Sequence, residues 1–267
     1  MFGALEEVQH DTYHCEDTYD QDGAVVSSPC SSSKAAHRPS EWLEQLIKRD
    51  KHLLNGPGEK EKFQAWRQIA DSDKMDRPLP FDMPPFGSRV VEFGAGLGQD
   101  TRNLAKAGYR VIGVEVSELA AAEAKAISEK TLTPEQLKNF EYVNYDALAL
   151  PKPVETIDFL ADFTVYCGLR HRYLGRMYEL WERIVAPGHT LVMFSCWKHT
   201  TPNAPVPVHR EDMVLDFAPM FDTLLAESCW KNQGLGGPDG AWCFWLRMKP
   251  KEQWGNFSHG RSDRKEL

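Results

Sequence analysis

A glycine-rich turn between two short apolar segments, within residues 89–116, constrains the fold of this chain more than any other feature. The first segment carries Val90, Val91 and Phe93, which favour a buried parallel strand. The turn and the residues after it then supply three glycines, a helix start and a second apolar segment that ends in an acid: Gly94, Gly96, Gly98, Asp100 and Glu115. Strand, glycine turn, helix and strand in this order are typical of an α/β fold with a parallel sheet.

The same segment predicts a nucleotide or nucleoside site. Glycines let a ligand approach the backbone closely, and a helix that starts near Asp100 presents its N-terminal amides to that ligand. Glu115, at the end of the second strand, can accept hydrogen bonds from two ribose hydroxyls. We therefore expect the ligand to lie across the carboxyl ends of these two strands.

The spacing of the glycines separates two kinds of ligand. A nicotinamide-dependent reductase usually has G-x-G-x-x-G, with its third glycine where this chain has Gln99. The spacing here is G-x-G-x-G, which disfavours a dinucleotide without excluding the reductase. Stabilisation by NAD(P)H but not by S-adenosylhomocysteine would favour the reductase.

The G-x-G-x-G spacing with an acid after the next strand resembles the class I S-adenosylmethionine-dependent methyltransferases. Residues 113–119, Gly-Val-Glu-Val-Ser-Glu-Leu, closely resemble thiopurine S-methyltransferases. Residues 163–168, Phe-Thr-Val-Tyr-Cys-Gly, resemble the aromatic strand end of plant and algal halide and thiol methyltransferases, and residues 195–209 are similar to the proline-rich substrate loop of both groups. The resemblance covers about residues 60–250.

The order of the expected elements agrees with this resemblance. The sequence predicts strands near 89–94, 110–116, 140–145, 157–163, 189–196, 222–230 and 241–248, and helices near 99–107, 117–130, 172–186 and 210–219. Such alternation predicts a Rossmann-like, seven-stranded, mostly parallel sheet with helices on both faces. The resemblance implies that the last strand, 241–248, is antiparallel.

The resemblance also implies a cofactor, S-adenosyl-L-methionine, and a set of residues that bind it. Asp146 and the Ala147 amide would contact the adenine, and Asp162 would lie near the amino group of the methionine moiety. An aromatic residue ahead of the first strand would close over the cofactor, and Trp66 is our candidate. The predicted cofactor-binding residues are Trp66, Glu92, Gly94, Gly96, Gly98, Asp100, Glu115, Val116, Asp146, Ala147 and Asp162.

For the methyl acceptor, the resemblance implies a small soft nucleophile: a halide, bisulfide or a thiol. Such a nucleophile needs no strong base, so an aromatic pocket that excludes water can supply much of the acceleration. Phe163, Tyr166 and Trp197 are the predicted pocket residues, with Tyr166 donating to an anion and Arg170 attracting it. We predict Tyr166 and Arg170 as catalytic residues and no metal.

Two other functions stay open at this stage. An O- or N-methyltransferase would need a base, for which the candidates are His171, His199 and His209. A cofactor-binding module without catalysis would bind the cofactor tightly and turn over no acceptor.

Composition and segment patterning predict the domain organisation. Seven acids and two bases within residues 1–40 supply most of the net charge of −8. We expect 1–40 to be a disordered acidic tail, 41–85 an N-terminal helical cap, 86–250 the methyltransferase domain and 251–267 a flexible C-terminal tail.

The remaining charge is nearly balanced, which gives no reason to expect a nucleic acid as partner. No apolar run reaches the length of a membrane span. The six cysteines form no C-x-x-C pair, a pattern that favours reduced thiols. We therefore expect a cytoplasmic monomer that acts on a small molecule, with no nucleic-acid or membrane partner.

Overall fold

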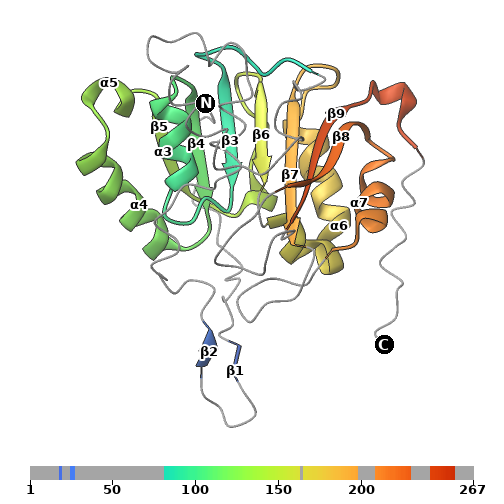
Figure 1. Ribbon diagram of the computed structural model, residues 1–267, viewed down its shortest axis with the longest axis horizontal. Helices are drawn as coiled ribbons and strands as arrows, with labels where there is room; N and C mark the ends of the chain where they lie inside the picture. Colours follow the sequence, from blue (N-terminus) through green and yellow to red (C-terminus); the bar gives the residue numbers. More distant parts are fainter. Residues whose placement is uncertain are drawn as a thin grey trace, which may run out of the picture.

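The computed structural model describes residues 18–19, 25–27, 81–162, 165–197, 208–229 and 241–255 of the 267-residue chain. Its main element is a seven-stranded sheet (Figure 1). In chain order, the strands are β3 (Arg89–Phe93), β4 (Arg110–Glu115), β5 (Phe140–Asn144), β6 (Phe159–Asp162), β7 (Leu191–Trp197), β8 (Phe221–Cys229) and β9 (Ala241–Met248).

The strands lie in the order β5-β4-β3-β6-β7-β9-β8. Neighbours from β5 to β7 pair in parallel, whereas β9 pairs antiparallel with both β7 and β8. The predicted Rossmann-like sheet with an antiparallel last strand is thereby confirmed. From β3 the sheet grows to one side through β4 and to the other side through β6, so the strand order switches at β3, and ligands of such sheets bind at the carboxyl ends beside this point.

Helices cover both faces of the sheet. They are α3 (Gln99–Lys106), α4 (Glu118–Thr131), α5 (Pro134–Leu137), α6 (Val165–Ile184) and α7 (Arg210–Phe217), with short 3-10 turns η3 (Ala147–Ala149) and η4 (Lys251–Gln253). Successive strand residues point to opposite faces of the sheet. Val90 packs with Leu104 of α3, whereas Val91 belongs to the cluster that includes residues of α6 and α7. The sheet is therefore buried on both sides, as its apolar strands predict.

Helix α6 begins seven residues earlier than the sequence predicts. The expected start was residue 172, but α6 starts at Val165, and Tyr173 interrupts it with a non-helical backbone (φ −127°, ψ 17°). Tyr166 and Arg170 consequently lie on the first turns of a helix rather than in a loop at a strand end. The aromatic run at 163–168 has the pattern of a strand end, which hid this start.

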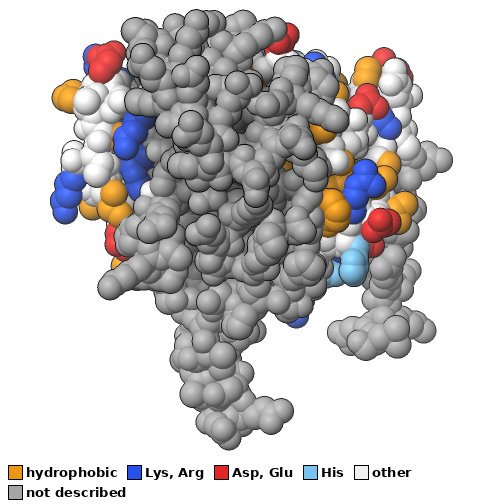
Figure 2. Space-filling view, in the orientation of Figure 1, with side chains coloured by type: hydrophobic (Ala, Val, Ile, Leu, Met, Phe, Trp, Pro, Cys, Tyr) orange, Lys and Arg blue, Asp and Glu red, His pale blue; other side chains and the backbone are white. Residues whose placement is uncertain are grey.

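Short elements also occur in the two segments expected to be tails. Strands β1 (Thr18–Tyr19) and β2 (Val25–Ser27) pair antiparallel within the acidic segment. At the other end, the Gly255 N–H donates to the Pro219 carbonyl and the Trp254 indole donates to the Lys249 carbonyl. These two bonds join Gly255 to Pro219 and Trp254 to Lys249, and the predicted boundary at residue 250 stays a prediction. On the face drawn in Figure 2, acidic, basic and apolar side chains are mixed over the described parts.

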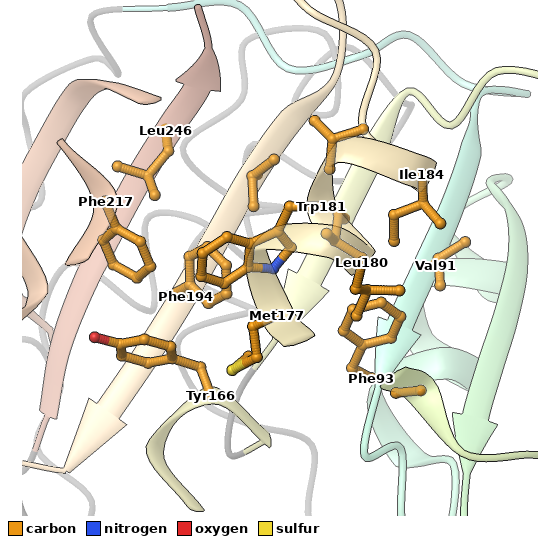
Figure 3. Packing of buried hydrophobic residues seen from close by; sticks show 14 of the residues in the cluster. Val91, Phe93, Tyr166, Met177, Leu180, Trp181, Ile184, Phe194, Phe217 and Leu246 are labelled. Carbon is orange, nitrogen blue, oxygen red and sulfur yellow. The ribbon is translucent and has the colours of Figure 1, made fainter. Parts of the chain in front are cut away.

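An aromatic cluster fills the space between the sheet and α6–α7 (Figure 3). Trp181 lies at its centre and its ring contacts five others: Tyr166, Tyr178, Phe194, Phe217 and Phe221. Phe194 and Phe217 stack with centroids 4.5 Å apart. This cluster fixes α6 and α7 against β7 and thereby positions the side chains that α6 presents at the carboxyl edge of the sheet.

Replacing Trp181 by Ala should lower the free energy of unfolding by about 3–5 kcal/mol, because a fully buried indole leaves a cavity that its ring neighbours cannot fill. Urea unfolding measures this change. Val154→Ala, at an exposed site, is the control and should shift stability by no more than about 0.5 kcal/mol. A loss below about 1 kcal/mol for Trp181→Ala would contradict this account of the cluster.

Candidate functional site

The glycine turn after β3 adopts a backbone that favours glycine at each of its three positions. Gly94, Gly96 and Gly98 have φ of 61°, 54° and 70°. Gly98 is also the N-cap of α3, and a Cβ added there would lie 2.9 Å from Cε2 of Tyr142. The turn therefore brings the first amides of α3 to the carboxyl end of β3, as the motif predicts.

The Glu115 carboxylate is held beside this turn by two backbone amides. Oε2 accepts from the Gly96 N–H at 2.9 Å, and Oε1 accepts from the Ser117 N–H at 2.9 Å. Each carboxylate oxygen keeps acceptor capacity, because a carboxylate has about four lone-pair sites. Glu115 is half-buried at the end of β4, so its oxygens are oriented before a ligand arrives, and their contact with two ribose hydroxyls stays a prediction.

Asn144 fixes the backbone on the other side of the acid. Its Nδ2 donates to the carbonyls of Glu115 and Val116, at 3.0 and 2.8 Å, and the Tyr145 N–H also donates to the Glu115 carbonyl. The ends of β4 and β5 are thus joined where the site lies. Val116 is exposed at this edge, which fits its predicted place beside the cofactor.

Glu92 is a buried acid beneath the turn rather than a surface ligand. Its Oε2 accepts from the Thr101 hydroxyl at 2.5 Å, and the side chain is 3% exposed. Burial raises the pKa of the Glu92 carboxyl well above its usual value and the charge of Asp100 raises it further, against the opposing effects of Thr101 and Arg102. The Thr101 hydrogen bond joins Glu92 of β3 to α3, and the contribution of Glu92 to cofactor binding stays a prediction.

The predicted adenine contacts, Asp146 and Ala147, lie at the start of η3. Asp146 Oδ1 caps this turn by accepting from the Leu148 N–H at 2.9 Å, and Oδ2 lies 3.8 Å from the Arg176 guanidinium. Arg183 donates to the carbonyls of Leu148 and Leu150, at 2.9 and 2.5 Å. Two arginines of α6 therefore hold the loop in which we predict the adenine to bind.

The predicted methionine end of the site is at Asp162. This fully buried carboxylate, the last residue of β6, accepts from the Tyr166 N–H with both oxygens at 3.1 Å. Glu115 and Asp162 follow strands that both neighbour β3, so they lie on either side of the glycine turn. A cofactor that lies across the turn, with its ribose at Glu115 and its amino acid end at Asp162, stays a prediction.

Tyr166 and Arg170 form a buried network with an acid of α7. The Tyr166 hydroxyl donates to Asp216 Oδ2 at 2.8 Å, and Arg170 contacts the same oxygen with NH2 at 2.7 Å and Nε at 2.8 Å. Burial raises the pKa of Tyr166, and the charge of Asp216 adds to this effect. Burial acts to lower the pKa of Arg170, but Tyr166 and Asp216 outweigh it and raise that pKa.

In this arrangement Tyr166 is fully buried and its ring packs against Phe217 (Figure 3). The contacts that the structure describes make Tyr166 and Arg170 a link between α6 and α7. Their direct contact with a methyl acceptor stays a prediction.

Three predicted residues cannot be placed. Trp66 and Phe163 lie outside the described residues, and Trp197 is described only as part of strand β7. Among the described residues no group of three or more metal-ligating side chains occurs. Within the same residues, no helix has the length and apolar character that a membrane crossing requires.

The cysteines agree only in part with the expectation of reduced thiols. Cys167 and Cys196 are free and buried, whereas Cys243 is in a disulfide. Burial raises the pKa of the Cys196 thiol, and its hydrogen bond with Cys167 adds to this effect. The raised pKa makes Cys196 poorly suited to act as a nucleophile, because the thiolate is the reactive form.

Sequence reasoning missed the residues that support the site without being expected to contact a ligand. These are Thr101, Arg102, Tyr142, Asn144, Arg176, Arg183 and Asp216. One signal was available: Gly113 stands inside the apolar strand β4, and a glycine there often marks the close approach of another group. The other residues carry no local pattern.

Comparisons with known proteins agree with the fold. Residues 90–188 match the family model of a methyltransferase domain. Among solved structures, the glycopeptide N-methyltransferase MtfA with bound S-adenosylmethionine is similar, with a TM-score of 0.51 at 13% identity over 62% of this chain and 89% of that chain. A S-adenosylmethionine-dependent methyltransferase from Methanosarcina mazei gives a TM-score of 0.50 at 13% identity, over 62% of this chain and 94% of that one. No curated protein matches the chain.

The family match and the fold define the class of protein. Residues 90–188 contain the glycine turn, Glu115, Asp146, Asp162 and the Tyr166 end of α6. Residues 90–188 therefore match a methyltransferase domain, and the sheet has the Rossmann-like methyltransferase fold. The similar glycopeptide N-methyltransferase binds S-adenosylmethionine, which supports the same cofactor here. These comparisons do not distinguish the thiopurine methyltransferases, or the halide and thiol methyltransferases, from other methyltransferases.

Glu92→Gln should reduce the loss of stability with rising pH. The folded state holds the Glu92 proton more tightly than the unfolded state, whose carboxyl has a pKa of about 4.3, so the wild type loses stability as pH rises above that value. Glutamine has no such proton, so the variant should gain on the wild type by up to about 1.4 kcal/mol per pH unit. Urea unfolding at pH 5, 6 and 7 measures this gain. Parallel curves for the two proteins would show that Glu92 titrates normally; Glu129→Gln, at an exposed position, should give parallel curves.

Proposed function

We propose that this protein transfers the methyl group of S-adenosylmethionine to a small soft nucleophile, and that among halides, bisulfide and thiols the preferred acceptor is a thiol. The proposal has two parts with different support. Cofactor binding follows from the class of the domain together with the orientation of Glu115. The acceptor follows from the groups that surround the methionine end of the site and from the sequence resemblance.

The observation that carries the acceptor proposal is that the buried acids near the methionine end of the site already accept hydrogen bonds. Asp162 accepts from the Tyr166 N–H, and Asp216 binds the Tyr166 hydroxyl and the Arg170 guanidinium. Each of these carboxylates is buried and already bonded, so neither is arranged as a general base for an alcohol or an amine. A thiol ionises readily by itself and needs less help from a base.

The histidines that could serve as an alternative base are placed as follows. His171 lies on α6 and His209 is the N-cap of α7, and both side chains are exposed; His199 lies outside the described residues. An exposed histidine gives no support for a water-excluded proton transfer. O- or N-methylation therefore stays the alternative.

The charge near Arg170 favours a thiol over a free halide. Asp216 contacts the guanidinium directly and Asp212 lies 3.7 Å from it, so the positive charge of Arg170 is compensated before any anion arrives. Capture of a halide ion depends on uncompensated positive charge, whereas an organic thiol is also held by apolar contacts. Phe163, Tyr166 and Trp197 are the proposed source of those contacts.

In the proposed reaction, the bound S-adenosylmethionine supplies a methyl group activated by its sulfonium. A thiolate would take this methyl group in line as the bond to the sulfonium sulfur breaks, which would leave S-adenosylhomocysteine, and the proton lost from the thiol would pass to solvent. The chain aligns the cofactor through Glu115 and the glycine turn. It contributes to the rate by orientation and by exclusion of water.

Glu115→Ala should weaken binding of S-adenosylhomocysteine by about tenfold to a hundredfold, because hydrogen bonds to a charged group contribute about 1.5–3 kcal/mol each. Titration calorimetry measures the Kd. Glu129→Ala makes the same charge change at an exposed position of α4 and should leave the Kd unchanged. Equal Kd values for Glu115→Ala and the wild type would refute the assignment of this acid to the ribose.

The acceptor is tested with S-adenosylmethionine and a panel of iodide, bromide, chloride, bisulfide, thiophenol and 6-mercaptopurine, with detection of volatile products and of S-adenosylhomocysteine. We expect turnover on thiols to exceed turnover on halides, and Glu115→Ala to lose it. Methyl halide as the main product would contradict the preference for thiols. Cofactor binding with no product on the whole panel would refute the soft nucleophile and favour an O- or N-acceptor or a module without catalysis.

A further inference from the structure

Tyr142 lies on β5, two strands from β3, and its side chain reaches the glycine turn that follows β3. It is paired with Gly113 of β4, and its ring lies over that glycine: a Cβ added to Gly113 would be 2.6 Å from Cε2 and 2.7 Å from Cδ2 of the ring. The ring then passes beside Gly98, where an added Cβ would again meet Cε2, at 2.9 Å. Two glycines in different elements therefore leave the space that this one side chain occupies.

The tyrosine hydroxyl reaches the middle of the turn. It donates to the Gly96 carbonyl at 2.5 Å, while the N–H of the same glycine donates to Glu115 Oε2 at 2.9 Å. The two peptide groups that flank Gly96 are thus fixed from opposite sides, one by a tyrosine and the other by the acid that we assign to the ribose. Gly96 has φ of 54° and no side chain to restrict its backbone, so these two hydrogen bonds limit its freedom.

The neighbours of Tyr142 hold it in this position. It is 4% exposed and packs with Ala95, Ala121 and Ala124, all small residues that fit closely against the ring. Burial raises the pKa of Tyr142, and the charges of Glu92 and Glu115 add to this effect. The hydroxyl therefore remains a donor throughout the pH range in which the protein is studied.

We propose that Tyr142 is a positioning residue for the cofactor: its hydrogen bond to the Gly96 carbonyl holds the glycine turn, and through it Glu115, in the arrangement that binds S-adenosylmethionine. Tyr142 sets the affinity for the cofactor without taking part in methyl transfer. This inference rests on the assignment of the glycine turn to the cofactor, which the proposed function shares.

The test compares two tyrosines that each donate to one backbone carbonyl. Tyr142→Phe keeps the ring and removes the bond to Gly96, whereas Tyr109→Phe removes a bond from a buried tyrosine to the Pro84 carbonyl, 3.0 Å long, ahead of β3 and away from the turn. We expect Tyr142→Phe to raise the Kd for S-adenosylhomocysteine about fivefold, the effect of one lost hydrogen bond. Tyr109→Phe should leave the Kd unchanged.

Kinetics separate positioning from a general loss of structure. For Tyr142→Phe, KM for S-adenosylmethionine should rise while kcat at saturating cofactor stays within about twofold of the wild type. Melting temperatures of the two variants should fall by similar amounts. A Kd for Tyr142→Phe equal to that of the wild type, or equal increases in both variants, would overturn the proposal.

A second variant reaches the same tyrosine from another residue. Gly113→Ala places a methyl group against the Tyr142 ring and 2.9 Å from Thr101 Oγ1, and we expect it to weaken S-adenosylhomocysteine binding more than Tyr142→Phe does, since the ring must move. A folded Gly113→Ala protein with wild-type affinity would overturn the proposal. Titrations of the wild type and of Glu115→Ala separate failure of this inference from failure of the proposed function. If the wild type does not bind S-adenosylhomocysteine, the cofactor assignment fails. If Glu115→Ala weakens binding but Tyr142→Phe does not, only this inference fails.

Discussion

The hydrogen bond from the Gly96 N–H to the Glu115 carboxylate joins the ends of β3 and β4 at the place where the cofactor is expected to bind. An acid this close to a backbone amide is oriented before any ligand arrives, so binding does not have to order it. Ser117 and Asn144 fix the same acid and its backbone, and the Tyr142 hydroxyl fixes the carbonyl side of Gly96. The rest of the site is arranged around this contact.

Helix α6 connects the other parts of the site. Its first turn donates to Asp162, its arginines hold the loop at Asp146, and Tyr166 and Arg170 bind Asp216 of α7. Tyr166 and Trp181, which lie on either side of the interruption at Tyr173, both pack in the aromatic cluster, so this cluster holds the two parts of α6 against each other and against α7. Compensation of Arg170 by Asp216 also explains why we favour a thiol over a free anion.

The sequence predicted the sheet and the glycine turn because each of these has a local pattern: apolar runs, spaced glycines, and an acid after a strand. The antiparallel last strand was implied by the resemblance to methyltransferases. It placed the start of α6 too late, because the aromatic residues before Arg170 are as typical of a strand end as of a buried helix. Asp216 and Tyr142 could not be found from their surroundings in the chain, since their roles depend on partners 50 and 46 residues away. Only Gly113 gave a hint of the close approach of Tyr142.

A crystal structure of the protein with S-adenosylhomocysteine tests the central claim most directly. We predict that both ribose hydroxyls donate to the Glu115 carboxylate, with the Gly96 N–H still bound to the same acid and the adenine beside Asp146 and Ala147. A ligand bound elsewhere, or a ribose that does not contact Glu115, would contradict this account of the site.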